Sequence, residues 1–273
     1  MRAAVELFEG ELIYALEQSE IDYWSKYYTT RSPVKCYANM IGGAFAAAVP
    51  GIDILALNRV IGLGLNGRIE SKSIDDIINF YKLAGSKRFF VQLSPFFKEA
   101  DTELMLLMKG FQLRNRWAKL FRSTSGSIPS VASGLKVVPV DLSQAREYAE
   151  IIYNCFDWQD ERLIDWLAQT VGMPGYRHYF ATYHGITVAA AALHISGNTA
   201  SMAFAGTLKE FRGLGAQGAL LKARIEDARR AGCDYIISET GQDTPEKPVV
   251  SYRNMKRFGF EEAYLRKNWI FEF

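Results

Sequence analysis

The sequence has few cysteines and histidines, three of each among 273 residues. Cys36, Cys155 and Cys233 are odd in number and stand at unrelated spacings, so they indicate neither a disulfide framework nor a metal cluster. Free cysteines suit a reducing compartment. We therefore expect a cytoplasmic protein without a metal site.

A large excess of charge of one sign is also lacking. Lysine and arginine number 32 against 30 aspartates and glutamates, which gives a formal net charge of +2. The basic residues are scattered and form no run, whereas a nucleic-acid-binding surface needs a basic patch or stripe. The composition gives no reason to expect nucleic acid as a partner, and nothing in it indicates an oligomer.

A long uninterrupted apolar run is missing as well. The longest apolar region, Ala38 to Leu65, contains Pro50, Asp53, Asn58 and Arg59 in the middle of any window that could span a membrane. The N-terminus meets an acidic residue at once and lacks the apolar core of a secretion signal. We expect no membrane association and interpret residues 38–65 as buried core.

What remains is the composition of an ordinary globular protein, with 49% hydrophobic and 23% charged residues. The length suffices for two domains of typical size. Residues 123–134 are small and polar without periodicity, as expected of a linker. The predicted organisation is a first domain over residues 1–122, a linker over 123–134 and a second domain over 135–273.

A glycine-rich loop lies between a predicted strand, Thr199 to Thr207, and a predicted helix, Gln217 to Ala231. The first N–H groups of a helix have no intrahelical partner and the helix dipole is positive there, so a phosphate or pyrophosphate is a favourable occupant. Gly213 and Gly215 let the backbone approach phosphate oxygens, and Arg212 adds a charged donor. The sequence therefore predicts a phosphate-binding loop.

The same glycines also match a dinucleotide-binding motif. Gly213, Gly215 and Gly218 satisfy G-x-G-x-x-G, and Glu239 follows about 20 residues later, where a ribose-binding acid is expected. In the dinucleotide fold, however, the first glycine directly follows a buried strand, whereas polar residues 209–212 intervene here. Too little chain follows Glu239 for the further strand–helix units, so we rank this alternative lower.

The loop resembles the pyrophosphate-binding motif of the GNAT acyltransferase superfamily, Arg/Gln-x-x-Gly-x-Gly/Ala. Gln217 departs from that pattern, because Gly or Ala is usual at the sixth position. A predicted strand, Asp234 to Glu239, and a predicted helix within Ser251 to Phe260 that ends in Gly-Phe resemble the closing elements of the family. The resemblance covers Leu135 to Phe273 in order, and it implies a GNAT fold, a mixed α/β (α+β) architecture, with acetyl-CoA as cosubstrate.

The other predicted elements of the second domain fit that order. They are a strand at Lys136–Val140, a helix that begins at Asp141 or Ser143 and runs through Cys155, a helix at Asp160–Val171, and strands at Tyr176–Thr182 and Thr187–Ile195.

The first domain repeats part of this pattern. We expect one or two helices over Leu7–Tyr28, a strand at Asn58–Leu65, a helix at Ile74–Leu83 capped by Ser73, a strand at Lys87–Leu93, a helix at Thr102–Lys109 and a strand at Arg116–Arg122. Helices ending in Gly, or in Gly-Phe before a strand with Trp, recur in both halves. We interpret the first domain as a diverged GNAT-like copy and expect it to form a wall of the acceptor pocket.

That copy lacks the phosphate loop. Gly62 and Gly64 fall within the predicted strand, and residues 71–73 carry neither the arginine nor the paired glycines. We expect no coenzyme in the first domain.

In the second domain, the resemblance implies that the strand ending at Ala205, Gly206 and Thr207 pairs with the pantetheine arm. One of its N–H groups would then be the oxyanion donor. The coenzyme-binding residues that the resemblance implies in the loop are Arg212, Gly213, Leu214, Gly215, Ala216 and Gln217.

The transfer also needs a proton donor for the leaving thiolate and can use a base for the amine. Many family members carry a Tyr four residues before the helix-ending Gly, and here that position is Met255. Tyr252 lies one turn earlier and is the candidate donor, with packing as its alternative role. Glu239 is the candidate base, and a solvated strand-end charge is the alternative for it.

The resemblance thus implies an N-acetyltransferase that moves an acyl group from acetyl-CoA to a small-molecule or peptide amine in a ternary complex. A non-catalytic acyl-CoA sensor or structural protein is the alternative. Dinucleotide binding ranks below both.

Overall fold

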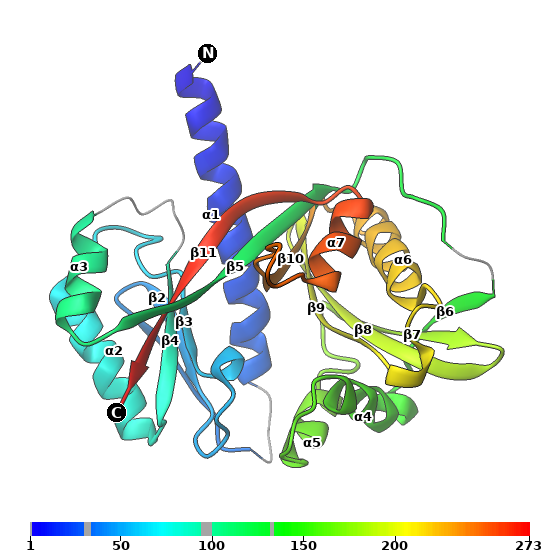
Figure 1. Ribbon diagram of the computed structural model, residues 1–273, viewed down its shortest axis with the longest axis horizontal. Coiled ribbons are helices and arrows are strands. Elements are labelled where there is room, and N and C mark those ends of the chain that lie inside the picture. Colours follow the sequence, from blue (N-terminus) through cyan, green and yellow to red (C-terminus); the bar gives the residue numbers. More distant parts are fainter. Residues whose placement is uncertain (1, 30–33, 94–99, 132–133) are drawn as a thin grey trace. The chain divides into compact units, whose positions relative to one another are not determined.

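The computed structural model describes residues 2–29, 34–93, 100–131 and 134–273 (Figure 1). It divides into two compact units. Unit 1 comprises Met1–Thr29, Lys35–Lys119 and Ala263–Phe273, and unit 2 comprises Thr30–Val34 and Leu120–Glu262. Two long strands, β5 (Gln112–Ser123) and β11 (Glu261–Glu272), contribute residues to both units.

The units differ from the predicted ranges at the end of the chain. Residues 263–273 belong to unit 1, because β11 pairs antiparallel with β4 (Arg88–Leu93) from Lys267↔Leu93 to Glu272↔Arg88. Residues 132 and 133 of the predicted linker lie outside the described residues. The first linker residue, Ser123, is the last residue of β5.

The strand order in unit 1 is β1-β2-β3-β4-β11-β5. Its elements are α1 (Arg2–Tyr28), β1 (Tyr37–Ile41), β2 (Ala44–Ala48), β3 (Arg59–Ile61), α2 (Ser71–Ala84), β4, α3 (Ala100–Met108), most of β5 and the later part of β11.

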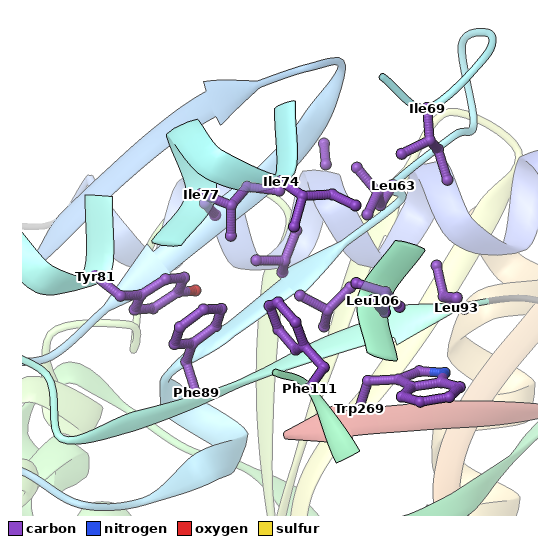
Figure 2. Packing of buried hydrophobic residues seen from close by; sticks show 14 of the residues in the cluster. Leu63, Ile69, Ile74, Ile77, Tyr81, Phe89, Leu93, Leu106, Phe111 and Trp269 are labelled. Carbon is purple, nitrogen blue, oxygen red and sulfur yellow. The ribbon is translucent and has the colours of Figure 1, made fainter. Parts of the chain in front are cut away.

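The apolar core of unit 1 lies between its sheet and helices α2 and α3. Ile74, Ile77 and Tyr81 of α2 and Leu106 of α3 pack against strand side chains that include Phe89, as Figure 2 shows. The rings of Tyr81 and Phe89 stack with centroids 3.8 Å apart. Because side chains alternate along a strand, the neighbours of Phe89 in β4 point to the other face of the sheet.

That other face of the sheet carries buried charged side chains among apolar ones, and α1 packs against it. Glu20 of α1 is buried and forms ion pairs with Arg59, Lys119 and Arg266. Glu17, also on α1, pairs with Arg266 at 3.2 Å. A helix that buries carboxylates against three cations is held by charge as well as by apolar contacts.

Two predictions in unit 1 were wrong in detail, and one feature was missed. Helix α2 begins at Ser71 with Glu70 as its N-cap, so Ser73 lies inside the first turn and does not cap it. Strand β3 ends at Ile61, because Gly62 and Gly64 adopt left-handed φ angles of 77° and 84° and leave the extended conformation. The glycines therefore follow the strand. The hairpin of β1 and β2 was not predicted.

The strand order in unit 2 is β6-β7-β8-β9-β10-β5-β11. Its elements are β6 (Leu135–Pro139), α4 (Ala145–Cys155), α5 (Arg162–Ala168), β7 (Tyr176–Tyr183), β8 (Ile186–Ser196), β9 (Thr199–Thr207), α6 (Ala216–Arg230), β10 (Tyr235–Gly241) and α7 (Val250–Arg257). Strands β6 to β9 pair antiparallel in chain order, and β10 pairs parallel to β9. The predicted order of elements is confirmed.

Two searches of the described residues gave negative results. None of the described helices combines the length and the apolar character that a membrane span requires. Among those same residues, no group of three or more histidine, cysteine, aspartate or glutamate side chains is arranged to hold a metal ion.

Candidate functional site

The predicted phosphate loop opens helix α6. After a short 3-10 turn, η3 (Lys209–Phe211), the backbone passes through Arg212 and then through two left-handed glycines. Gly213 and Gly215 both have φ of 87°, a conformation that other residues rarely adopt, and Gly215 is the N-cap of α6. A side chain at Gly213 would meet nothing within 4 Å. The loop is therefore exposed and open where the helix begins.

The structure brings the six predicted loop residues together at this helix start. Arg212 is exposed, and its Nε donates to the carbonyl oxygen of Thr207 at 3.4 Å, which links the loop to the end of β9. Leu214 is exposed at the tip, whereas Ala216 is buried as the first residue of the helix and Gln217 is half-buried. The first-turn N–H groups and the arginine thus share one site.

The third glycine of the dinucleotide pattern has a packing role. A side chain at Gly218 would lie 3.2 Å from the ring of Phe258, so this glycine permits α6 to approach the end of α7. The antiparallel pairing of β6 to β9 also differs from the parallel sheet of the dinucleotide fold. The fold of unit 2 therefore disfavours dinucleotide binding.

Strand β9 bulges just before the loop. Ala190 of β8 pairs with Gly206, but Ala192 pairs with Ala203, so β9 contains one more residue than β8 over this interval. Phe204 lies within the bulge and has a φ of 41°. A bulge leaves one residue outside the ladder and bends the strand. Here it bends the segment that contains Ala205, Gly206 and Thr207.

Strands β9 and β10 part beyond the third pair. Thr199, Ala200 and Ser201 pair with residues 235–237, whereas β9 continues to Thr207 and β10 to Gly241. Met202, the first residue of β9 past the ladder, is buried, and the later residues of both strands are half-buried. Backbone donors and acceptors need partners, and a segment that still pairs with β8 on one side can accept an extended ligand on the other.

Only glycine fits at position 206, because a residue of helix α4 packs directly against it. A side chain at this position would lie 2.4 Å from Cβ and 2.7 Å from Sγ of Cys155, the last residue of α4. Burial raises the pKa of the Cys155 thiol, which Arg212 lowers and Glu210 raises to smaller extents. The thiol therefore lies within electrostatic reach of the phosphate loop, a contact that no pattern in the sequence indicates.

The structure places Glu239 on the parted segment of β10, two residues after the last paired residue, where it is half-buried. Its neighbour Thr240 shares a hydrogen bond of 2.6 Å with the hydroxyl of Ser251 on α7. Sequence reasoning missed Ser251. It lies one helical turn before Met255, which is buried at the position where the family often has Tyr.

The other candidate, Tyr252, has a different partner. Its hydroxyl donates to Oε2 of Glu262 at 3.0 Å, and partial burial, followed by the Glu262 carboxylate, raises the pKa of Tyr252. Residues 251 and 252 are adjacent, so their side chains diverge by about 100° around the helix. The contacts of α7 therefore connect Ser251 to β10 and Tyr252 to β11.

The two buried histidines, His178 and His194, have structural roles in strands β7 and β8. The Nε2 atom of His178 shares a hydrogen bond of 2.9 Å with Thr170, and burial lowers the pKa of His178 to about 4. His194 is fully buried, and its ring lies 4.6 Å from that of Tyr176. Neither belongs to the segments described above.

Comparisons with known proteins support the fold. No model of a protein family matches the sequence, and no curated protein sequence matches it. Among solved structures, a GCN5-related N-acetyltransferase from Kribbella flavida is 15% identical with a TM-score of 0.65, and the match covers 92% of this chain and 94% of that one.

Two further structures are similar. A tandem GNAT protein from the clavulanic acid biosynthesis pathway is 16% identical with a TM-score of 0.61, over 85% of this chain and 79% of that one. A GCN5-related N-acetyltransferase from Sphaerobacter thermophilus is 11% identical with a TM-score of 0.61, over 86% and 81%. The chain therefore has the GNAT fold over most of its length, and the predicted fold is confirmed.

Proposed function

We propose that the protein is an N-acetyltransferase that takes an acetyl group from acetyl-CoA and transfers it directly to an amine. One observation carries this proposal: the bulged, half-unpaired end of β9 leads through the short turn η3 into a glycine loop at the start of α6. An extended ligand with a pyrophosphate at one end fits both parts of this arrangement.

The residues present suit the coenzyme. The pyrophosphate would lie against the first-turn N–H groups of α6, between the left-handed glycines and the Arg212 guanidinium. The amide-bearing pantetheine arm would pair with the β9 edge at residues 205–207, in the way a strand pairs. Gln217 narrows this site and can also donate a hydrogen bond.

In the transfer, the neutral amine attacks the thioester carbonyl, a C–N bond forms, and the C–S bond then breaks. A backbone N–H near the β9 bulge would stabilise the oxyanion, because a fixed donor there needs no reorganisation. Glu239 would accept the proton that the ammonium form of the acceptor must lose, directly or through water. The nitrogen loses its extra proton to water as the amide forms, and the departing thiolate takes a proton from a hydroxyl or from water.

Two hydroxyl groups are candidates for that last proton. Tyr252 is protonated at neutral pH like any tyrosine, but its raised pKa makes it a weaker acid, and its hydrogen bond leads to Glu262. Ser251 is bonded to Thr240, beside Glu239 on the parted segment of β10. We retain Tyr252 as the predicted proton donor. We add Ser251 as a second candidate, because its own hydrogen bond connects it to β10.

A non-catalytic acyl-CoA sensor is the second candidate function. The buried Met255 at the position of the usual Tyr, and the bond of Tyr252 to Glu262, favour it. Both candidates need the same coenzyme site, so binding alone does not separate them.

Turnover does separate the two functions. The full chain should be incubated with acetyl-CoA and a panel of amines, amino acids and peptides, and the release of free thiol should be followed. We expect thiol release above the amine-free rate with at least one acceptor, together with an acetylated product found by mass spectrometry. Tight binding of acetyl-CoA without thiol release for any amine would assign the sensor function instead.

A further inference from the structure

Three aromatic rings meet where the turn between α4 and α5 approaches the β9 bulge. The ring centroids of Phe156 and Trp158, both in the turn, are 5.3 Å apart. Phe204 of the bulge lies 6.2 Å from Phe156 and 6.0 Å from Trp158, edge to face with each. Phe156 is 44% exposed, and the other two rings are half-buried. We call these three residues the aromatic cluster.

The backbone beneath the aromatic cluster is strained. Phe204 and Asp157, which stands between the two aromatic residues of the turn, have φ angles of 41° and 51°. Among described non-glycine residues, the only other positive φ is at His184, in a hairpin turn. Aspartate tolerates this conformation, but for a phenylalanine it costs on the order of 1–3 kcal/mol, and such strain tends to persist at functional sites. The strain thus points to a role for the rings beyond packing.

The aromatic cluster adjoins the proposed site of acyl transfer. Phe204 immediately precedes residues 205–207, which would pair with the pantetheine arm. Cys155 ends α4 against Gly206, so the turn that carries Phe156 and Trp158 begins at the same place. A group that contacts these rings would therefore lie close to the thioester carbon.

Acidic side chains accompany the rings. Asp157 and Glu161 are exposed, whereas Asp160 is bonded to Arg162 at 2.8 Å. An amine arrives mainly as an ammonium ion, which both carboxylates and aromatic faces attract. An uncharged acyl chain would gain nothing from the carboxylates, so the chemistry of this surface favours the acceptor over the acyl group.

We propose that the aromatic cluster binds the acceptor, and that the acceptor is a primary amine attached through a short chain to an aromatic group. This inference rests on the proposed acetyltransferase function and specifies its substrate class. The ring of the acceptor packs against Phe156, Trp158 and Phe204, and Asp157 attracts the ammonium group before deprotonation.

The test compares phenethylamine with n-butylamine and D-glucosamine as acceptors, with acetyl-CoA as donor. We expect the highest kcat/KM with phenethylamine, and Trp158→Ala should lower it about tenfold or more while changing the value for n-butylamine little. Phe156→Ala, at an exposed position, provides a second variant that should also reduce the preference. Asp157→Asn keeps a residue that tolerates left-handed φ and should raise KM for phenethylamine.

Tyr235→Ala is the matched control. Tyr235 is a half-buried aromatic residue at the other end of the β9–β10 ladder, where its ring meets Phe121 at 6.0 Å, so this variant should keep the preference for phenethylamine. Equal or higher kcat/KM for glucosamine, or a preference unchanged by both Trp158→Ala and Phe156→Ala, would overturn the inference and leave the acetyltransferase proposal intact.

Two further outcomes are informative. If the variants changed the preference between acetyl-CoA and hexanoyl-CoA and left the amine preference unchanged, the aromatic cluster would contact the acyl chain, and the inference would be wrong. Absence of thiol release with every amine tested would instead contradict the proposed function on which the inference rests.

Discussion

At the scale of single residues, the contact between Gly206 and Cys155 determines the shape of the β9 end. Gly206→Ala would place a methyl group 2.4 Å from Cβ of Cys155, and no cysteine rotamer relieves a clash with its own Cβ. The β9 end must then move, and we expect acetyl-CoA affinity to fall by about tenfold or more. Calorimetric titration measures this loss.

A second-site change checks the cause. Cys155→Gly removes the clashing atoms, so the double variant should recover most of the affinity. Gly241→Ala is the control, because its methyl group would meet Val249 at an ordinary 3.7 Å and should be tolerated. Equal losses in the single and double variants would show that the clash is not the reason for the effect.

The two hydroxyl candidates on α7 can be distinguished by kinetics. If Tyr252 protonates the thiolate, Tyr252→Phe should lower kcat by roughly 10²-fold with coenzyme affinity nearly intact. If Ser251 has that role, Ser251→Ala should have this effect and Tyr252→Phe should not. Full activity in both variants would leave water as the proton donor.

Sequence reasoning reached some residues of the site and not others. The glycine loop was predictable, because the need for left-handed φ at Gly213 and Gly215 is visible as residue type. Phe204 carries no such signal, since a phenylalanine in a strand pattern predicts ordinary extended backbone. The contact of Cys155 with Gly206 joins residues far apart in sequence and was equally hidden.

At the scale of elements, helix α1 depends on a buried ionic cluster. Burial alone would raise the pKa of Glu20, but Arg266, followed by Lys119 and Arg59, lowers it well below its usual range. Glu20→Gln would leave these three cations with one fewer carboxylate, which should reduce the free energy of unfolding by about 3–5 kcal/mol. Urea denaturation measures this loss.

A surface pair provides the comparison for Glu20. Asp75 pairs with Lys109 at 2.6 Å and is about half exposed, so Asp75→Asn should cost less than about 1 kcal/mol. Similar losses of unfolding free energy in the two variants would mean that the ionic cluster contributes less to stability than its burial implies.

Strand β7 carries a buried group that should make stability depend on pH. The pKa of His178 is lowered by burial to about 4, against an ordinary value of 6.5. The unfolded chain therefore binds a proton at this residue that the folded chain does not, and stability should fall as pH decreases from 6.5 towards 4, by at most about 3 kcal/mol.

Two variants isolate this dependence. His178→Gln has no titrating side chain and should show a flatter stability profile between pH 6.5 and 4 than the parent. His184→Asn removes an exposed histidine at a left-handed turn position and should leave the profile unchanged. Identical profiles for His178→Gln and the parent would show that the folded protein binds a proton at His178 as readily as the unfolded chain does.

The elements of unit 2 follow closely from the sequence, because alternation and turn residues mark the strands. Strand β9 was predicted with the observed bounds. The predicted ends of elements were wrong where tertiary contacts determine them. Ser73 is a good capping residue, yet α2 begins earlier, and Ser73 instead packs so close to Gly42 that a side chain there would lie 2.6 Å from its Cβ.

At the scale of the whole molecule, the last strand, β11, joins a sheet whose neighbouring strand β4 is far away in the sequence. Gln92 of β4 donates to Asn268 of β11 at 2.8 Å, across 176 residues of sequence. Local periodicity predicted a strand near the C-terminus but could not tell which sheet it joins, since pairing depends on long-range packing.

Unit 1 explains why one coenzyme per chain is expected. The loop after β3 also contains left-handed glycines, but a side chain at Gly62 would lie 2.6 Å from Cδ1 of Ile21 on α1. The first turn of α2 lies against Gly42 of the β1–β2 turn. At these two points the loop after β3 and the first turn of α2 pack against other parts of the chain, which supports the expectation that unit 1 binds no coenzyme.

The most direct test of the account is a calorimetric titration of the full chain with acetyl-CoA. We predict one equivalent per chain for the parent and no detectable binding for Gly215→Asp, whose carboxylate would occupy the phosphate position. Gly215→Asn has the same size and the same left-handed strain without the charge, and should retain measurable affinity. Unchanged affinity in a folded Gly215→Asp variant, or two equivalents bound by the parent, would contradict the account.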